Sequence, residues 1–286
     1  MSERELVITA VPTPFVDDGT IDLRALESLL AELSPRVDGV LMAGTTGEFP
    51  ALSDEERVRL FEVAVSALGP ARVIGHIGHP SGYQVRRLAE ASLAVGVRRF
   101  ALLTPYYLPT DATGVLRWYA DVSKDLGEYA IYPYFFPERT GLVVEPDLAR
   151  DVMALPGMAG LKVSGAAAAR IAEYAGVLGA DQRLWSGSDG ELPSVLGAGG
   201  HGVISGVSAA FPDLFGRLRA AVATSQGLQE VQDDVERAVR LVGPSVSRLL
   251  LALRLRTGSA WAGRMSGPAV DEETAEAIRA VVAHLT

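Results

Sequence analysis

Short apolar segments alternate with amphipathic segments over most of the chain, and this alternation limits the possible folds more than any other feature. The apolar segments have the length of strands, and the segments between them repeat their apolar residues with helical spacing. Parallel neighbours need long crossover connections, which such helices provide, so the alternation predicts a parallel α/β sheet. The predicted strands are residues 6–10, 39–42, 72–76, 100–103, 130–134, 160–162, 183–185 and 202–204. The predicted helices are residues 23–33, 54–68, 81–94, 113–126, 145–154, 166–176, 192–196 and 212–223.

Eight such units in a chain of 286 residues fit a closed (β/α)8 TIM barrel better than an open doubly wound sheet. Spacing alone does not show closure, so the open sheet remains the alternative. After about residue 226 the alternation stops, and helical patterns follow at 228–241, 245–256 and 272–284. We therefore predict a barrel over residues 1–225 and a small C-terminal helical subdomain over residues 226–286.

Composition excludes several classes of protein. The net charge of −9 offers no basic stripe for nucleic acid, so we expect no nucleic-acid partner. The chain has no cysteine, which excludes disulfides and thiolate catalysis. No apolar run approaches the roughly 18 residues that cross a bilayer, and residues 1–6 lack the pattern of a secretion signal. We expect a cytoplasmic protein with no membrane partner.

Lys162 ends the sixth predicted strand, and chemistry in a barrel is expected at the C-terminal strand ends. Burial disfavours the ammonium form of a lysine, so this amine could stay neutral enough to attack a carbonyl and form a Schiff base. The structural alternative is a lysine at a strand end whose amine reaches solvent. The residues at neighbouring strand ends decide between the two.

Polar groups gather at those neighbouring strand ends. Tyr134 lies one strand away and could relay protons to the amine, with Thr45 and Tyr107 extending the relay. The backbone amides of Thr45 and Thr46, in a glycine-flanked loop, could hold a carboxylate. Arg139 offers a bidentate fork for a second carboxylate. Each residue also has a structural interpretation. Tyr134 could be an aromatic residue at the rim of the barrel, Thr45 and Thr46 could form a plain turn, and Arg139 could be a solvated turn residue.

Other polar residues favour a structural role. Glu48 and Asp189 are possible acids, but structural hydrogen bonding is the preferred interpretation. His76 and His79 have no third metal ligand in view, so we predict no metal site. Ser53 and Glu56 have the spacing of a capping box, which predicts the start of the second helix.

Taken together, the strand ends resemble the dihydrodipicolinate synthase/N-acetylneuraminate lyase family of class I aldolases. The resemblance covers nearly the whole chain, and its pieces are specific in combination. They are Gly44-Thr45-Thr46-Gly47-Glu48, Thr104-Pro105-Tyr106-Tyr107, Tyr134 with Pro137 and Arg139-Thr140-Gly141, Gly160-Leu161-Lys162, and Gly202-Val203-Ile204-Ser205.

The resemblance implies roles for these residues. Lys162 would form a Schiff base with pyruvate or a related 2-keto acid, and Tyr134 would be the proton relay. Thr45 would link Tyr134 to Tyr107, which would come from the neighbouring subunit of a tight dimer. Thr46 would bind the carboxylate of the keto acid, while Gly187 and Ile204 would line the pyruvate pocket. The family implies a homo-oligomer, commonly a tetramer, with no metal and no organic cofactor.

The second substrate is less constrained by the resemblance. An arginine at position 139 is typical of the synthase branch, where it meets the carboxylate of aspartate semialdehyde. The chain departs from the family where Phe135 replaces an asparagine and where Val163 and Ser164 replace an acid after the lysine. Some synthases of the family are inhibited by lysine, which binds at a feedback site. Residues 79–84 lack the asparagine and glutamate that hold lysine there. Phe135 and Phe136 predict an apolar pocket mouth, so an aldolase or dehydratase of a 2-keto-3-deoxy sugar acid, or a lyase of N-acetylneuraminate, is the alternative.

Two other classes remain open from the sequence. A barrel isomerase could use its glycine loops to bind a phosphate, although residues 186–190 fit such a loop only in part. A barrel without catalytic activity could serve as a binding or regulatory protein. Lys162, Tyr134, Thr45 and Tyr107 are all present, which favours the Schiff-base enzyme over both.

Overall fold

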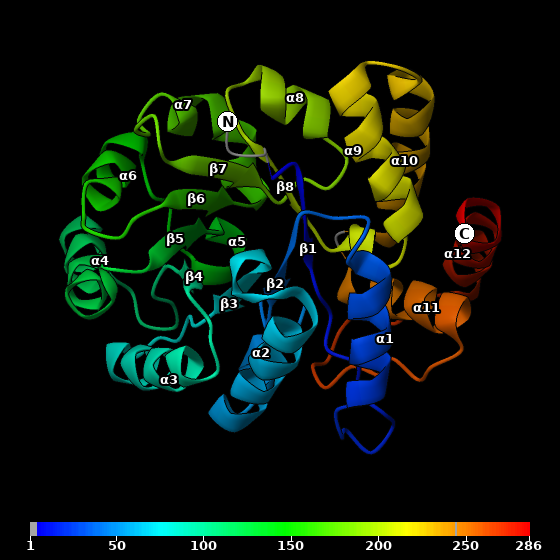
Figure 1. Cartoon of the computed structure of the whole chain (residues 1–286), viewed down its shortest axis with the longest axis horizontal. Helices are drawn as coiled ribbons and strands as arrows, with labels where there is room; N and C mark the ends of the chain where they lie inside the picture. Colours follow the sequence, from blue (N-terminus) through cyan, green and yellow to red (C-terminus); the bar gives the residue numbers. More distant parts are fainter. Residues whose placement is uncertain (1–4, 244) are drawn as a thin grey trace.

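Eight parallel strands close into a barrel in the computed structural model, which describes residues 5–243 and 245–286 (Figure 1). Each strand pairs with the next in the sequence, and β8 pairs with β1 through Ile8 and Ile204. The predicted (β/α)8 barrel is therefore confirmed over the open sheet. The strands are β1 Val7–Ala10, β2 Gly39–Met42, β3 Val73–His76, β4 Arg99–Leu103, β5 Ala130–Phe135, β6 Gly160–Val163, β7 Arg183–Ser186 and β8 Gly202–Ser205.

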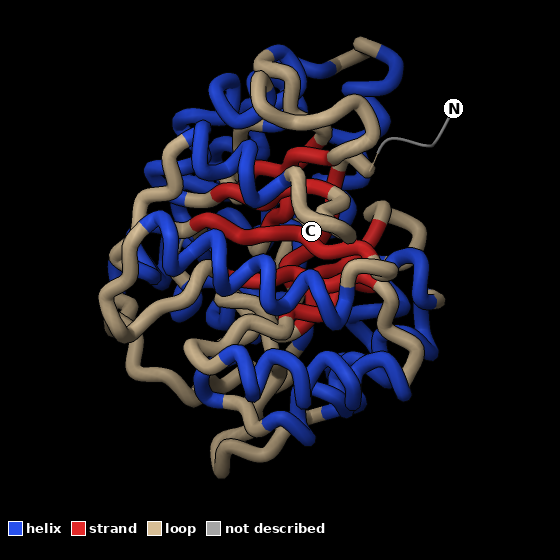
Figure 2. The backbone as a smooth tube through the Cα atoms, turned by 90° about the vertical axis from the view of Figure 1, so that its left-hand side faces the viewer, coloured by secondary structure: helices blue, strands red, loops and turns tan. Residues whose placement is uncertain are grey.

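Helices surround the barrel, and in Figure 2 the strands lie inside a layer of helices. The helices that follow the strands are α1 Leu23–Leu33, α2 Asp54–Leu68, α3 Gly82–Ala94, α4 Ala112–Leu126, α5 Pro137–Thr140, α6 Pro146–Met153, α7 Ile171–Ala175, α8 Leu192–Gly197 and α9 Pro212–Thr224. The predicted capping box is present, since Ser53 Oγ accepts from the amide of Glu56 and the Glu56 side chain accepts from that of Ser53. Most predicted boundaries agree with the structure to within one residue.

Two segments differ from the prediction. Residues 166–176 do not form one helix: a 3-10 helix covers Gly165–Arg170, and α7 begins only at Ile171. Gly165 has a positive φ of 58°, and the carboxylate of Glu138 accepts from the amide of Ala166. The start of the 3-10 helix therefore depends on a side chain that is distant in the sequence. The segment predicted as a turn after β5 contains the short helix α5, which starts at a proline and ends at the left-handed Gly141.

The C-terminal part of the chain forms three further helices, α10 Leu228–Val242, α11 Val246–Thr257 and α12 Glu272–Leu285. Helix α10 packs on α9, and α11 packs on α12 (Figure 1). Buried residues of these helices, such as Val235, Leu253 and Ile278, belong to the same continuous hydrophobic cluster as the helices of the barrel. The division of the chain at residue 225 into two folding units stays a prediction.

The interior of the barrel is a separate apolar layer. It is formed by side chains that point inward from the strands: Ile8, Ala10, Leu41, Ile74, Ala101, Tyr132, Trp185 and Ile204. Above it, toward the C-terminal strand ends, Phe49, Leu103 and Tyr134 form a smaller cluster. Because side chains alternate along a strand, Tyr132 and Tyr134 both face the interior, at two different heights.

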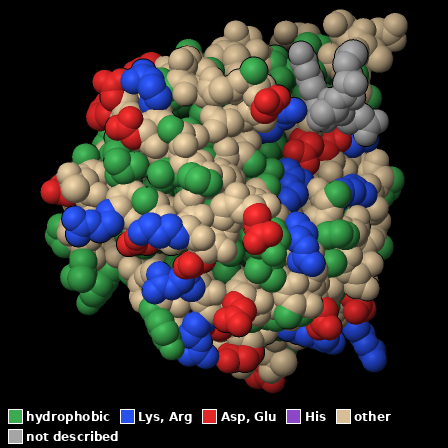
Figure 3. Space-filling model, turned by 60° about the vertical axis from the view of Figure 1, so that its left-hand side comes forward, with side chains coloured by type: hydrophobic (Ala, Val, Ile, Leu, Met, Phe, Trp, Pro, Cys, Tyr) green, Lys and Arg blue, Asp and Glu red, His purple; other side chains and the backbone are tan. Residues whose placement is uncertain are grey.

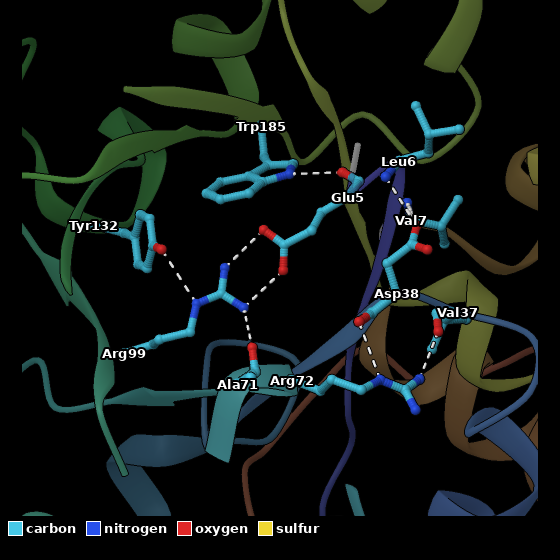
Figure 4. A network of polar contacts seen from close by, with 10 residues as sticks. All are labelled: Glu5, Leu6, Val7, Val37, Asp38, Ala71, Arg72, Arg99, Tyr132 and Trp185. Atoms are coloured by element: carbon cyan, nitrogen blue, oxygen red, sulfur yellow. Dashed lines mark hydrogen bonds and ion pairs between the residues drawn. The ribbon is translucent and has the colours of Figure 1, made fainter. Parts of the chain in front are cut away.

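A polar network closes the N-terminal end of the barrel (Figure 4). The guanidinium of Arg99 donates to both carboxylate oxygens of Glu5, at 2.7 and 2.8 Å, and to the carbonyl of Ala71. It also donates to the hydroxyl of Tyr132 at 3.2 Å, while the indole of Trp185 donates to the carbonyl of Glu5. This end of the barrel therefore has its polar groups paired.

The outer surface carries mixed charges. On the face shown in Figure 3, acidic and basic side chains are interspersed. Helices α4 and α6 carry pairs three residues apart, such as Asp121 with Lys124 and Asp147 with Arg150. Exposed pairs of this kind contribute little to stability. Within residues 5–243 and 245–286, no helix is both long and apolar enough to cross a bilayer. Residues 1–4, part of the segment where no secretion signal is predicted, lie outside the described residues.

Candidate active site

Lys162 and Tyr134 lie side by side at the C-terminal end of the barrel. They are direct partners in the parallel pairing of β5 and β6, which confirms the prediction that they lie at the same height. Lys162 is only 4% exposed, and its Nζ lies 4.1 Å from the centre of the Tyr134 ring. A cation at this distance over an aromatic face is favourable. The strand pairing therefore fixes the distance between the amine and the phenol.

The amine of Lys162 has no carboxylate partner. Among the described residues we find neither an ion pair nor a hydrogen bond of its Nζ, and none of the Tyr134 hydroxyl. Most buried lysines are paired, because an unpaired buried ammonium is costly. An unpaired amine beside a free phenol is the arrangement that a carbonyl substrate needs, since the amine attacks and the phenol exchanges protons.

His76 lies inside the barrel at the end of β3 and touches Tyr134. Its ring centroid is 6.4 Å from that of Tyr134 and 4.5 Å from that of Phe49, and both contacts are edge-on. Nδ1 lies 3.1 Å from the carbonyl of Ala43, which can only accept, and 3.4 Å from a guanidinium nitrogen of Arg57, which can only donate. On the shorter contact we assign the proton to Nδ1. Nε2 is then a buried acceptor without a hydrogen-bond partner among the described residues. Burial, and then the charges of Arg57 and Lys162, hold the pKa of His76 well below its usual range.

Arg57 supports His76 from helix α2. It is 2% exposed, and its guanidinium donates to the backbone carbonyls of His76 and Gly78. Burial lowers the pKa of Arg57 to about 10. Neither residue is among the site residues predicted from the sequence. Arg57 precedes Leu60 and Phe61 by three and four residues, so it occupies the buried face of α2, and that spacing is the signal that could have identified it.

The loop after β2 holds Thr45 and Thr46 at the mouth of the barrel. The loop is bracketed by two residues with left-handed backbones, Ala43 at φ 50° and Glu48 at φ 54°. The hydroxyl of Thr45 is buried and has no hydrogen-bond partner among the described residues. Thr13 donates from its hydroxyl to the carbonyl of Gly47 at 2.7 Å and so fixes the end of the loop.

The opposite wall of the mouth comes from the ends of β6, β7 and β8. The amide of Gly187 donates to the carbonyl of Val163 at 2.7 Å, and a Cβ atom at Gly187 would lie 2.1 Å from Ser164 Oγ. The serine after Val163 therefore requires a glycine at position 187. Ile204 is 4% exposed in the interior layer. The Asp189 carboxylate accepts from the amide of Val207 at 3.2 Å.

Arg139 lies on α5 and faces a large cavity. Its guanidinium is 5.3 Å from the centre of the Phe136 ring, and no carboxylate pairs with it among the described residues. The cavity has a volume of about 1070 Å³ and extends from the barrel mouth to α11 and the start of α12. Thr45 and Arg139 both line it, whereas Lys162 and Tyr134 do not. Arg139 is therefore free to bind an anion that enters from this side.

Tyr107 does not join this group within one chain. Its side chain is 88% exposed, and its backbone has a positive φ of 79°. The next residue, Leu108, is 73% exposed, so the loop after β4 presents two apolar side chains to its surroundings. Tyr106 instead is half-buried, and its ring packs edge-on against Phe49. The two adjacent tyrosines thus differ in their surroundings: Tyr106 packs on Phe49, and Tyr107 is exposed.

The prediction that Phe135 makes the pocket mouth apolar is wrong. Phe135 is the outward-pointing neighbour of Tyr134 and is 1% exposed. Its ring packs against Tyr119 of α4 and Tyr174 of α7, outside the barrel. Alternation along β5 explains the error, because residues next to an inward residue face the helices. Phe136 does lie at the mouth, 5.9 Å from the ring of Tyr134.

The described residues contain no group of three or more histidine, cysteine, aspartate or glutamate side chains that could hold a metal. His76 lies in the barrel interior, and His79 lies in the loop after β3, where its Nδ1 accepts from the amide of Ser81. The two histidines are thus engaged separately.

Known proteins resemble this chain in sequence and in fold. Residues 3–241 match the model of the dihydrodipicolinate synthetase family. The 4-hydroxy-tetrahydrodipicolinate synthase of Heliobacterium modesticaldum is 32% identical over 201 residues, which are 70% of this chain and 67% of that protein. A monomeric dihydrodipicolinate synthase variant has a TM-score of 0.89 at 27% identity, covering 99% of this chain and 98% of its own. A catalytic lysine mutant of the Ruminococcus gnavus sialic acid aldolase has a TM-score of 0.88 at 19% identity, covering 100% and 96%.

Proposed function

The chain belongs to the dihydrodipicolinate synthetase family and is an enzyme of the aldolase type, and from this premise we propose that it forms a Schiff base between Lys162 and pyruvate. The observation that carries the proposal is the buried, unpaired amine of Lys162, held 4.1 Å from the ring of Tyr134 by the pairing of β5 and β6. An amine in that position suits attack on a keto group.

The reaction begins when the amine of Lys162 attacks the keto carbon of pyruvate. A carbinolamine forms, water leaves, and the product is an iminium that joins Nζ to the former keto carbon. The iminium withdraws electrons, so the adjacent methyl group loses a proton and becomes an enamine carbon. That carbon attacks the aldehyde of the second substrate. Hydrolysis of the new iminium then returns the amine and releases the product.

Tyr134 moves the protons in these steps. Its ring contacts the amine, and its hydroxyl is not engaged with any described residue. A phenol is a weak acid, so it acts as a relay within a hydrogen-bonded chain. The buried, unpartnered hydroxyl of Thr45 is the next member of that chain. Tyr107 completes the relay from a neighbouring subunit, which its exposure in a single chain supports.

The two carboxylates of the substrates bind at opposite sides of the mouth. The carboxylate of pyruvate binds to the loop that carries Thr45 and Thr46, with Gly187 and Ile204 forming the wall behind it. The carboxylate of the aldehyde binds to Arg139, whose guanidinium is unpaired and lines the cavity. On this basis the second substrate is aspartate semialdehyde, and the enzyme acts as a dihydrodipicolinate synthase.

The size of the cavity favours a second candidate. About 1070 Å³ is more than a four-carbon aldehyde fills, and a longer 2-keto-3-deoxy sugar acid or N-acetylneuraminate would use more of it. The enzyme would then cleave that acid to pyruvate and an aldehyde through the same Schiff base. Both candidates use a Schiff base on Lys162, and they differ in the aldehyde that is joined to pyruvate or released from it.

A panel of second substrates tests these assignments. The purified enzyme is given pyruvate with aspartate semialdehyde and, separately, a 2-keto-3-deoxy sugar acid and N-acetylneuraminate. Ring-forming condensation with aspartate semialdehyde supports the synthase, and its loss in Arg139→Ala supports the assigned carboxylate site. Cleavage of a sugar acid without condensation favours the second candidate. An enzyme that neither condenses nor cleaves in the presence of pyruvate contradicts the proposed function.

A further inference from the structure

A short segment between α11 and α12 lies across the loops at the C-terminal end of the barrel. We call residues 261–265 the C-terminal strap. The amide of Ala262 donates to the carbonyl of Phe15 at 2.8 Å, and the two residues form an antiparallel bridge. The guanidinium of Arg264 donates to the carbonyl of Gly19 at 2.8 Å and to that of Ala51 at 2.9 Å. The strap thus joins the loop after β1 to the segment after β2.

Arg264 also forms an ion pair with helix α2. Its two terminal nitrogens donate to the two carboxylate oxygens of Glu56, at 2.7 and 2.6 Å, and its guanidinium lies 4.3 Å from the centre of the Phe15 ring. The side chains of Arg264 and Glu56 are 24% and 30% exposed, so this two-oxygen pairing is partly shielded from water. Such a fork defines an orientation as well as a distance.

Glu48 is the second attachment of the strap. Its side chain is 3% exposed, and Oε2 accepts from the amide of Met265 at 2.6 Å. A Cβ atom at Gly263 would lie 3.2 Å from Oε1, so the glycine lets the strap approach the carboxylate. Burial raises the pKa of Glu48, while the amides of Met265 and Arg264 and the charge of Arg264 act in the opposite direction. The strap supplies the amide that donates to Oε2, while Oε1 is buried and has no hydrogen-bond partner among the described residues.

Glu48 immediately follows the loop that carries Thr45 and Thr46, and its backbone is strained. Glu48 has φ 54° and ψ 41°, Ala43 at the other end of the loop has φ 50°, and Trp261 in the strap has φ 43°. Non-glycine residues keep left-handed backbones only where the surroundings hold them. The bond from Met265 to Glu48 is one of the contacts that hold this loop.

We propose that Glu48 is a positioning residue, through which the C-terminal strap holds the loop of Thr45 and Thr46 in the conformation that binds the carboxylate of pyruvate. The inference rests on the proposed function, since it assigns that loop to the carboxylate. Glu48 acts only through this loop, which carries the amides assigned to the carboxylate as well as the Thr45 hydroxyl, so the main effect of its loss is expected in the binding of pyruvate. The helices after the barrel are on this account part of the substrate site, because they carry the strap.

The test compares three variants by their kinetics. Glu48→Ala removes the acceptor of the Met265 amide and is expected to raise the KM for pyruvate about tenfold, with kcat within about threefold of wild type. Glu48→Gln keeps one oxygen that can accept and is expected to restore KM to within about threefold. Glu55→Ala is the matched control, because Glu55 is exposed at the start of α2, next to Glu56, and no contact of it with the strap is found among the described residues.

An unchanged KM in folded Glu48→Ala overturns the proposal. A loss in kcat at unchanged KM also overturns it, because the strap would then position Thr45 for proton transfer and not the amides that bind the carboxylate. If Glu48→Ala does not fold, Arg264→Lys takes its place, since it keeps the charge but loses the fork on Glu56. It is expected to raise KM about threefold, and an unchanged KM in this variant overturns the proposal equally.

Amide exchange separates this proposal from the proposed function. The amides of residues 48 and 49, which donate to the carbonyls of Thr45 and Gly44, are expected to exchange faster in Glu48→Ala or Arg264→Lys than in wild type, with or without pyruvate. Equal exchange contradicts the positioning role even if the enzyme forms its Schiff base. A wild-type enzyme that forms no pyruvate adduct contradicts the proposed function instead.

Discussion

The two ends of the barrel are built from the same eight strands, yet they treat buried polar groups in opposite ways. At the N-terminal end, Arg99 donates to Glu5, Ala71 and Tyr132, and every one of these contacts is made within the chain. At the C-terminal end, Thr45 Oγ1 and His76 Nε2 are buried without a partner among the described residues. Unsatisfied buried groups are rare in folded proteins and call for an explanation.

Strand β5 contains this contrast within three residues. Tyr132 and Tyr134 both point into the barrel, but the hydroxyl of Tyr132 accepts from Arg99, whereas that of Tyr134 is not engaged with any described residue. Tyr132 is therefore part of the structure that closes the barrel, and Tyr134 is available to a substrate. The comparison indicates that stability is concentrated at one end of the barrel and chemistry at the other.

The strongest test of this division is Tyr134→Phe. Removal of the hydroxyl is expected to lower kcat by about 10²- to 10³-fold, because the proton relay beside Lys162 is lost. The free energy of unfolding is expected to stay within about 0.5 kcal/mol of wild type, since the hydroxyl bonds to no described residue. Steady-state kinetics and urea unfolding measure the two quantities. A destabilised variant with normal kcat would reverse the assignment.

The converse test at the N-terminal end is Arg99→Met. The variant leaves the carboxylate of Glu5 and the hydroxyl of Tyr132 without their partner. Because the side chains of Arg99 and Glu5 are only 12% and 26% exposed, we expect a loss of about 2–3 kcal/mol in the free energy of unfolding. Turnover per folded molecule is expected to stay near wild type, and a tenfold fall in kcat would contradict the division between the two ends.

His76 links the C-terminal end to pH. Its folded pKa is lowered by burial, so between the folded pKa and the unfolded value near 6.5 the unfolded chain binds more protons. Stability is therefore full above about pH 6.5 and is lost as the pH falls below it, by up to about 1.4 kcal/mol per pH unit. His76→Gln is expected to flatten the stability curve between pH 5 and 6.5. An unchanged slope in the variant's urea midpoints would show that another group titrates.

Tyr132→Phe gives the smallest expected effect and is the matched partner of Tyr134→Phe. It removes one hydrogen bond to Arg99 at the N-terminal end, which is expected to cost about 1 kcal/mol in the free energy of unfolding. Its kcat and KM are expected to equal those of wild type. If Tyr132→Phe lowered kcat as much as Tyr134→Phe, position along β5 would not separate stability from chemistry.

Much of the fold and part of the site could be predicted from the sequence, because both follow from strand periodicity. The alternation of segments placed Lys162 and Tyr134 at neighbouring strand ends, and the register confirms it. The same periodicity places Phe135 on the helix-facing side of β5, in conflict with the prediction that it lies at the pocket mouth. The position of an aromatic beside a site residue is thus predictable only if inward and outward residues are distinguished.

The parts that could not be predicted depend on contacts between distant segments. Glu48 accepts a hydrogen bond from the amide of Met265, which is 217 residues away, and no local sequence pattern in either segment predicts this contact. The spacing of Arg57 to Leu60 and Phe61 indicates the buried face of α2, but its bonds to the carbonyls of His76 and Gly78 depend on the packing of α2 against the loop after β3. The exposed position of Tyr107 follows from the path of the loop after β4, which the sequence leaves open.

Trapping the Schiff base tests the central claim most directly. The enzyme is treated with pyruvate and borohydride, digested, and analysed by mass spectrometry. The account predicts a reduced pyruvate adduct on Lys162 and none on Lys124, the chain's other lysine, whose side chain is 72% exposed and pairs with Asp121 on helix α4. Lys162→Ala should abolish the adduct. An unmodified Lys162, or an adduct on Lys124 alone, would contradict the assignment of the C-terminal end of the barrel as the site of chemistry.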